Sequence, residues 1–279
     1  MATPNFEQIQ SFSKVTNQLI QRATDDFMAL YDSAMTIDEV IELETQIAAR
    51  YQELASELGA QWYDLCTRLA NIEADAAELQ EVDSDSIRQR ARAAVETAPL
   101  DKTIDAVFNY FLHNEIQNSI RTTGSANLNR DYERGLVSGK WARVPVGDTC
   151  AWCLMLASQG AWYLSKESAL GNNGGHYHDG CDCVAVYHAD ADNIPNYENL
   201  LRYKRMYYDA ENARVANKNG NKKYDEELQE RVDRAKVQHA EREEAKKQRA
   251  IERGEEYTEN PWTRYNETLI VMRYQNGLK

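Results

Sequence analysis

The chain has 279 residues, with only 5 prolines and 13 glycines, and 28% of its residues are charged. This composition favours helices and supplies enough apolar residues for one large domain or two small ones. The net charge of −13 argues against a general DNA-binding role, because phosphate contacts need a cationic surface. No run of about 18 apolar residues occurs and no apolar stretch follows a basic start, so the sequence predicts neither a membrane span nor a signal peptide.

A first helix is expected over Phe6 to Met35 and a second over residues 37–69, where Thr36 and Glu39 form a capping box. In the second helix, apolar residues recur three or four positions apart, which predicts one buried face. That face is expected to hold Val40, Ile47, Leu54, Leu58 and Leu65. Gly59 interrupts the pattern and indicates either a kink or a close contact between helices.

Two further helices are expected before residue 140, where no β pattern occurs. One covers about 84–97 and ends before Pro99, and the other covers 102–122 and is stopped by Gly124. Cys66 lies alone in a helical pattern, so it is predicted to be a buried apolar residue.

The pattern changes after residue 139. The stretches "KWARVPVG" and "CVAVYHA" alternate like strands, and "AWYL" is a third candidate strand. His188, in the second stretch, is expected to be an exposed strand residue. Turn-rich pieces such as "GNNGG" and "HDG" separate these candidates, so this part of the chain has too few apolar residues for a large core.

Beyond residue 190 the chain becomes helical again. Residues 222–253 contain ten Lys or Arg and nine Asp or Glu at spacings that support a solvated helix. The apolar stripe of this segment is thin and consists of Leu228, Val232, Ala235 and Val237. An exposed arm is the simpler interpretation and a docking or coiled-coil helix is the alternative. The final residues regain apolar character and are expected to fold back as a strand or a helix.

The fold class predicted from these elements is α+β and mostly α, in three parts. Residues 1–138 form a helical docking region, residues 139–189 a small zinc-binding α+β unit, and residues 190–279 a charged helical arm and tail.

Four of the five cysteines lie in the middle part. Cys150 and Cys153 form C-x2-C, and His178, Cys181 and Cys183 form H-x2-C-x-C. Two such knuckles can close a tetrahedral site of sulfur and nitrogen ligands, which suits Zn²⁺. A cytosolic chain disfavours disulfides, and no βαβ pattern supports a redox C-x2-C.

Only four of these five ligands are needed. The favoured set is Cys150, Cys153, His178 and one of Cys181 and Cys183, and an all-cysteine site is the alternative. His176 is a weaker candidate. No H-E-x-x-H, G-x-S-x-G or Walker motif is present, and no glutamate follows one of the candidate ligand histidines at the H-x-E spacing of zinc deaminases. The sequence therefore predicts a closed structural zinc site whose metal contributes folding free energy, and predicts no enzyme.

Two blocks carry a family resemblance. "WARVPVGDTCAWCLMLASQGAWYLS" with "YHDGCDCVAV" closely resembles phage minor head proteins of the Mu F-like class, in the actinobacteriophage and prophage branch often called capsid morphogenesis proteins. "ARYQELASELGAQWYDLC" resembles the N-terminal helix motif of that branch. Together the blocks run from Arg50 to Val186, about half of the chain.

The resemblance implies a structural protein that is present in few copies in the virion. It would associate with the portal vertex during head assembly, contact portal and other capsid or scaffold proteins, and be able to leave with the DNA. It would lie in the host cytoplasm during assembly and bind no specific nucleic acid and no membrane. The resemblance also assigns Cys150, Cys153, His178, Cys181 and Cys183 to the family's C-x2-C and H-x2-C-x-C positions. Some relatives are labelled head maturation proteases, so a protease or another zinc-dependent enzyme is the alternative, although no catalytic Ser/His/Asp signature supports it.

Overall fold

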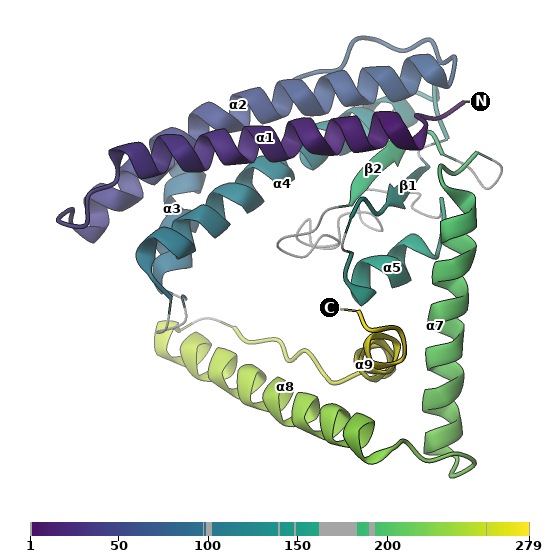
Figure 1. The fold of residues 1–279 in the computed structure, drawn as a ribbon. Coiled ribbons are helices and arrows are strands. Elements are labelled where there is room, and N and C mark those ends of the chain that lie inside the picture. The colour runs from purple at the N-terminus through teal and green to yellow at the C-terminus, as the bar shows by residue number, and fades with distance from the viewer. Residues whose placement is uncertain are drawn as a thin grey trace. The chain divides into compact units, whose positions relative to one another are not determined.

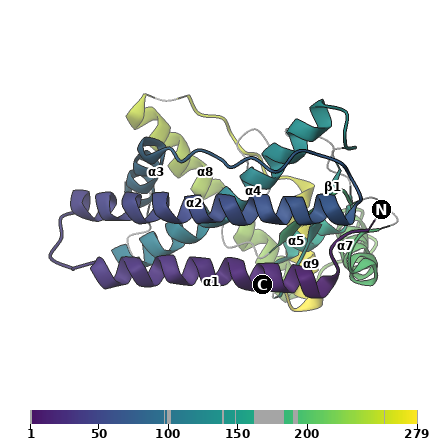
Figure 2. The same ribbon diagram turned by 90° about the horizontal axis from the view of Figure 1, so that it is seen from above.

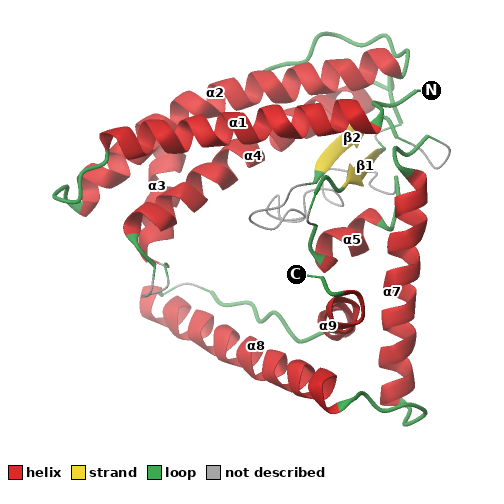
Figure 3. Ribbon diagram, viewed as in Figure 1, coloured by secondary structure: helices red, strands yellow, loops and turns green. Residues whose placement is uncertain are grey.

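The computed structural model describes residues 2–96, 98, 102–138, 140–147, 149–161, 183–189, 193–254 and 256–278. The chain forms two compact units, each built from two stretches. Unit 1 comprises Met1–Gly147 and Gly160–Tyr197, and unit 2 comprises Asp148–Gln159 and Glu198–Lys279. Figure 1 shows the elements along the chain, and Figure 3 shows that helices dominate them. The mostly helical prediction is confirmed, and the expected zinc-binding range 139–189 contributes to both units.

In its described part, unit 1 contains four helices and a two-stranded sheet. Its elements are α1 (Phe6–Leu30), α2 (Ile37–Leu69), α3 (Ser84–Glu96), α4 (Ile104–Glu133), β1 (Trp141–Val144) and β2 (Val184–Tyr187). Capping boxes start the first two helices, from Asn5 with Gln8 and from Thr36 with Glu39 as predicted. Each box satisfies amide groups that have no partner inside the helix, and so fixes where the helix begins.

The helices α1 and α2 form an antiparallel pair, which Figure 2 shows side by side. The Phe12 ring stacks on Trp62 with centroids 4.2 Å apart, so the start of α1 lies by the end of α2. In contrast, α4 runs parallel to α2. A Cβ on Gly59 would lie 2.5 Å from the Ile120 carbonyl oxygen. Of the two expectations for Gly59, a kink or a close contact between helices, the structure therefore shows the close contact.

The expectation that Gly124 ends α4 is wrong. The helix continues to Glu133, and Gly124 is buried inside it. A Cβ at this position would overlap the Tyr187 hydroxyl group. The glycine therefore makes room for an aromatic ring of β2, and the cost of an interior glycine is offset by this packing.

The buried face of α2 differs in part from the predicted one. Val40 and Ile47 are buried, but Leu54 is 41% exposed, and Leu58 and Leu65 are only half-buried. The reason is that α2 contacts α1, α3 and α4, so its buried surface is wider than one stripe. Small and aromatic side chains fill the rest of this surface, including Ala48, Tyr51, Ala55 and Tyr63.

A glutamate also lies in this core. Glu44 of α2 is fully buried, and neither carboxyl oxygen has a hydrogen-bond partner in the described part of the chain. Burial, with a smaller contribution from the charge of Glu115, raises the pKa of Glu44 to about 9. Glu115 itself is paired with Arg90 at 2.6 Å. Glu44 is therefore an uncharged carboxylic acid at neutral pH.

The sheet is antiparallel, with Trp141 opposite Tyr187 and Val144 opposite Val184. Every residue of both strands is buried, because the sheet packs on Ile9 and on side chains of α2 and α4. Two of the three predicted strands are thus confirmed. The third candidate, "AWYL", lies outside the described residues after Ala161.

Unit 2 is helical in its described part, with α5 (Ala151–Ala157), α7 (Tyr197–Lys218, whose first residue belongs to unit 1), α8 (Glu226–Arg253) and α9 (Arg264–Asn276). Its core gathers side chains from all four helices, among them Leu154, Tyr203, Leu228, Val232 and Met272. The final segment therefore folds back as a helix, one of the two expected forms.

The charged helix α8 is partly covered. Leu228 and Val232 are buried, whereas Val237 is 58% exposed. Further along, the Tyr257 hydroxyl and the Asn260 amide both donate to the Glu243 carboxylate, at 2.9 and 3.0 Å. The expected exposed arm is thus exposed over much of its length but held by the segment that follows it. None of the described helices is long and apolar enough to cross a membrane.

Candidate functional site

The Trp-Tyr-Asp step at the end of α2 joins three other parts of unit 1. The Trp62 indole donates to the Ala185 carbonyl of β2 at 2.7 Å, and the Tyr63 hydroxyl donates to Asp131 of α4 at 2.8 Å. The Asp64 carboxylate accepts from the Ala77 amide at 3.0 Å. Successive helical residues point about 100° apart, so three neighbours in sequence can reach three different elements.

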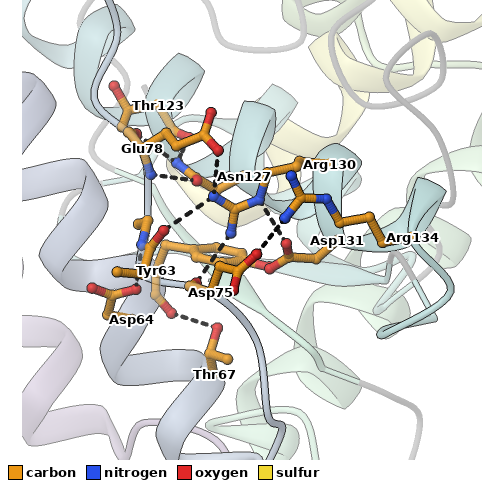
Figure 4. Close-up of polar contacts among 12 residues, drawn as sticks. Tyr63, Asp64, Thr67, Asp75, Glu78, Thr123, Asn127, Arg130, Asp131 and Arg134 are labelled. Carbon is orange, nitrogen blue, oxygen red and sulfur yellow. Dashed lines mark hydrogen bonds and ion pairs between the residues drawn. The ribbon is translucent and has the colours of Figure 1, made fainter.

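Asp131 is the buried centre of a polar network, whose contacts Figure 4 shows. It is fully buried, and its second oxygen accepts from the Arg130 guanidinium at 2.7 Å. Arg130, whose side chain is 12% exposed, also donates to the Asp75 and Ala76 carbonyls at 3.1 Å each. Burial and the nearby Asp131 charge raise the pKa of Tyr63 far above its usual range, so the phenol stays protonated and donates.

The same network holds the irregular segment 70–83 against α4. Asn127 accepts from the Glu78 amide at 2.7 Å and donates to the Glu78 carbonyl at 2.9 Å. Arg134 donates to the Asp75 carboxylate at 2.5 Å. Segment 70–83 lacks the backbone hydrogen bonds of a helix or a strand, and these bonds to α4 side chains give it a defined position instead.

A groove of about 860 Å³ lies between α1, α2 and segment 70–83. The apolar side chains along it are Phe12, Val15, Leu58, Trp62, Leu65 and Ile72. Its charged residues are Glu7, Asp64, Asp75 and Arg68, three acids against one base. This arrangement suits a row of apolar side chains flanked by basic ones. The half-burial of Leu58 and Leu65 follows from their place in the groove.

His188 is buried, with 4% exposure, so the expectation of an exposed strand residue is wrong. It follows the last residue of β2 and has a left-handed backbone, with φ of 58°. Its Nε2 lies 2.9 Å from the Thr67 hydroxyl, and burial lowers its pKa to about 4. His188 is therefore a neutral side chain that links the end of the sheet to α2.

The predicted zinc ligands are only partly within the described residues. Cys150 and Cys153 belong to unit 2, where Cys150 is half-buried and Cys153 buried. Cys183 belongs to unit 1 and is buried, and His178, Cys181 and the weaker candidate His176 lie outside the described residues. Across the described ranges, no three His, Cys, Asp or Glu side chains are arranged to hold a metal ion. Cys66 is buried, as predicted, and burial raises its thiol pKa to about 12.

Sequence reasoning missed the groove and the Asp131 network. Segment 70–83 forms one wall of the groove, and it has no periodic pattern from which its position against the helices could be predicted. The Trp-Tyr-Asp step was the available signal, since Trp62 and Asp64 both line the groove.

Comparisons with known proteins relate the chain to gene 15 proteins of phages. Residues 1–210 match the family model described as VG15 protein. The chain is similar to the gene 15 protein of Mycobacterium phage D29, with 29% identity over 197 residues that cover 59% of this chain and 71% of that protein. It is also similar to the gene 15 protein of Mycobacterium phage L5, with 31% identity over 131 residues that cover 34% of this chain and 44% of that protein. No solved structure matches the chain.

Proposed function

The chain belongs to the VG15 protein family, and we propose that it is a structural protein of a phage head, a minor capsid protein that associates with the portal vertex during assembly. The observation that carries the proposal is that the family match spans both the α2 motif and the cysteine block, with gene 15 proteins of two phages as relatives. The side chains of the α2 motif support it, because they join elements into a scaffold rather than converge on reacting groups.

On this proposal the partners are the portal protein and other capsid or scaffold proteins. The protein lies inside the capsid or at the portal vertex of the virion, and in the host cytoplasm before assembly. It is present in few copies and can leave the head with the DNA. The net charge of −13 supports docking on protein rather than on nucleic acid.

The test is a phage carrying a nonsense mutation in this gene. We expect the mutant to yield no infectious DNA-filled heads, and the full chain supplied from a plasmid to restore them. Mass spectrometry of normal particles should detect the protein at far lower abundance than the major capsid protein, and tagged protein should retain the portal protein from infected cells. Normal heads from the mutant, with no copy of the protein in normal particles, would contradict the proposal.

We also propose that the cysteine–histidine block binds one structural Zn²⁺ ion. The ligand chemistry supports it, because thiolate and imidazole groups at this spacing suit tetrahedral zinc.

Protein purified under reducing conditions without chelators should contain about one zinc per chain by elemental analysis. Cys150→Ser should lose the metal, whereas Cys66→Ala, which changes a buried cysteine outside both motifs, should retain it. His178→Ala should weaken zinc binding strongly if His178 is a ligand, and only modestly if four cysteines form the site. Metal-free protein with the four motif thiols paired as disulfides would rule the site out.

A further inference from the structure

The helix α7 has apolar side chains on two opposite faces. One face, with Tyr203 and Ala210, is buried in the core of unit 2. The other face is exposed and consists of Tyr197, Leu201, Tyr208 and Val215, with exposed fractions of 50%, 45%, 61% and 39%. We call these four residues the outer stripe. Single exposed apolar residues are ordinary, but an aligned row of four on one helix indicates a contact surface.

Helical geometry places the outer stripe on one line. Its members follow Tyr197 by 4, 11 and 18 residues, close to one, three and five full turns. Lys204 and Arg205 lie beside the stripe in the same helix. Residues 197–208 contain three basic residues and one acidic residue, so the first half of α7 carries a net positive charge. Over the full length of the stripe, residues 197–215, there are four basic and three acidic residues.

The groove of unit 1 has the complementary properties. Its floor is apolar, and Val15 on its edge is 46% exposed. Its wall belongs to an acidic stretch, because residues 71–82 contain four acidic residues and no basic one. Asp75 and Glu78 are paired with Arg134 and Arg130, so the excess negative charge of the wall comes from Glu73 and Glu81. An amphipathic helix binds such a groove through apolar anchors one to several turns apart, while charges at the rim select the partner and its orientation.

We propose that the outer stripe of α7 binds the groove between α1, α2 and segment 70–83 of a second copy of this chain. The two surfaces match in apolar character and are opposite in charge, and the same polypeptide carries both. Because they are different patches, the contact is head-to-tail: each copy can donate a helix to one neighbour and accept a helix from another. Such contacts build a ring when the rotation closes and an open chain when it does not. This inference does not rest on the proposed function, because it concerns the purified chain alone.

Sedimentation velocity on the purified full chain tests the self-association. The parent protein should show concentration-dependent assembly beyond a dimer. Val15→Asp in the groove and Leu201→Asp in the outer stripe should each weaken assembly by about tenfold or more, because a charge would enter an apolar contact. Val237→Asp changes a similarly exposed apolar residue of α8 outside both surfaces, and should assemble like the parent. Circular dichroism establishes that all variants remain folded.

A mixture of the two defective variants gives the sharper result. The Val15→Asp copy keeps a normal α7 and the Leu201→Asp copy keeps a normal groove, so together they can form one contact and no more. The mixture should give a 1:1 dimer that does not extend, while each variant alone remains a monomer. A monomeric parent at every concentration, or a mixture that fails to associate, would overturn the proposal. Parent-like assembly by either variant alone would also overturn it.

Discussion

Replacing Asp131 with alanine should lower the free energy of unfolding of unit 1 by about 3–5 kcal/mol, the usual cost of removing one partner of a buried ion pair. The variant would leave the Arg130 guanidinium, which is 12% exposed, without its carboxylate partner at 2.7 Å. It would also leave the buried Tyr63 hydroxyl without its acceptor at 2.8 Å. Urea denaturation followed by tryptophan fluorescence would measure the loss, in a background where Trp152, Trp162 and Trp262 are replaced by phenylalanine so that Trp62 and Trp141 report on unit 1.

A matched control is Asp38→Ala, which breaks an ion pair with Arg92 whose side chains are 71% and 50% exposed. Its effect should be about 0–1 kcal/mol, because water solvates both charges. Asp131→Asn keeps an acceptor for the Tyr63 hydroxyl and should fall between the two. Equal losses for Asp131→Ala and Asp38→Ala would show that the network does not stabilise unit 1.

The parent protein should become less stable as pH rises from about 5 to 9, because of Glu44. Burial raises the pKa of this carboxyl from its ordinary value of 4.5 to about 9 in the folded state. Between these values the folded state holds one more proton than the unfolded state, so the free energy of unfolding falls by about 1.4 kcal/mol per pH unit. Above about pH 9 both states are ionised and this contribution stops changing.

Glu44→Gln removes the titrating group while keeping a similar shape. Its free energy of unfolding should not decline with pH as that of the parent does. Between the unfolded pKa and pH 7, the parent should lose about 3 kcal/mol that the variant keeps. Glu57→Gln, at an exposed position of the same helix, should follow the parent. Denaturation at a series of pH values measures this, and parallel curves for the parent and Glu44→Gln would contradict a buried neutral acid.

Local signals in the sequence predicted the helices well. Thr36 and Glu39 define the start of α2 through bonds within four residues, so no knowledge of the fold was needed. The two strands were likewise visible in their alternation. Contacts between residues far apart in the sequence could not be predicted. An example is Gly124, which lacks a Cβ where the ring of Tyr187, more than sixty residues later, packs against it.

The same limit applies to the candidate site. The three/four spacing predicted that Leu54 is buried and gave no signal for Glu44. A helix that contacts three other helices and a strand buries polar and small residues as well as large apolar ones. His188 was misplaced because its left-handed backbone and its contact with Thr67 depend on where the sheet meets α2. The groove depends on Arg130 and Asn127 holding a segment that has no pattern of its own.

The discontinuity of unit 2 has a consequence during translation. The apolar helix α5 packs on α9, yet the whole of α7 and α8 lies between them in sequence. At ribosomal speeds of about 5–20 residues per second, α5 leaves the exit tunnel roughly 5–20 s before its partner is made. In that interval Leu154, Met155 and Leu156 lack part of their final cover, so apolar side chains of the nascent chain stay exposed to water. A ribosome that stops before α9 would release a chain whose second unit cannot complete its core.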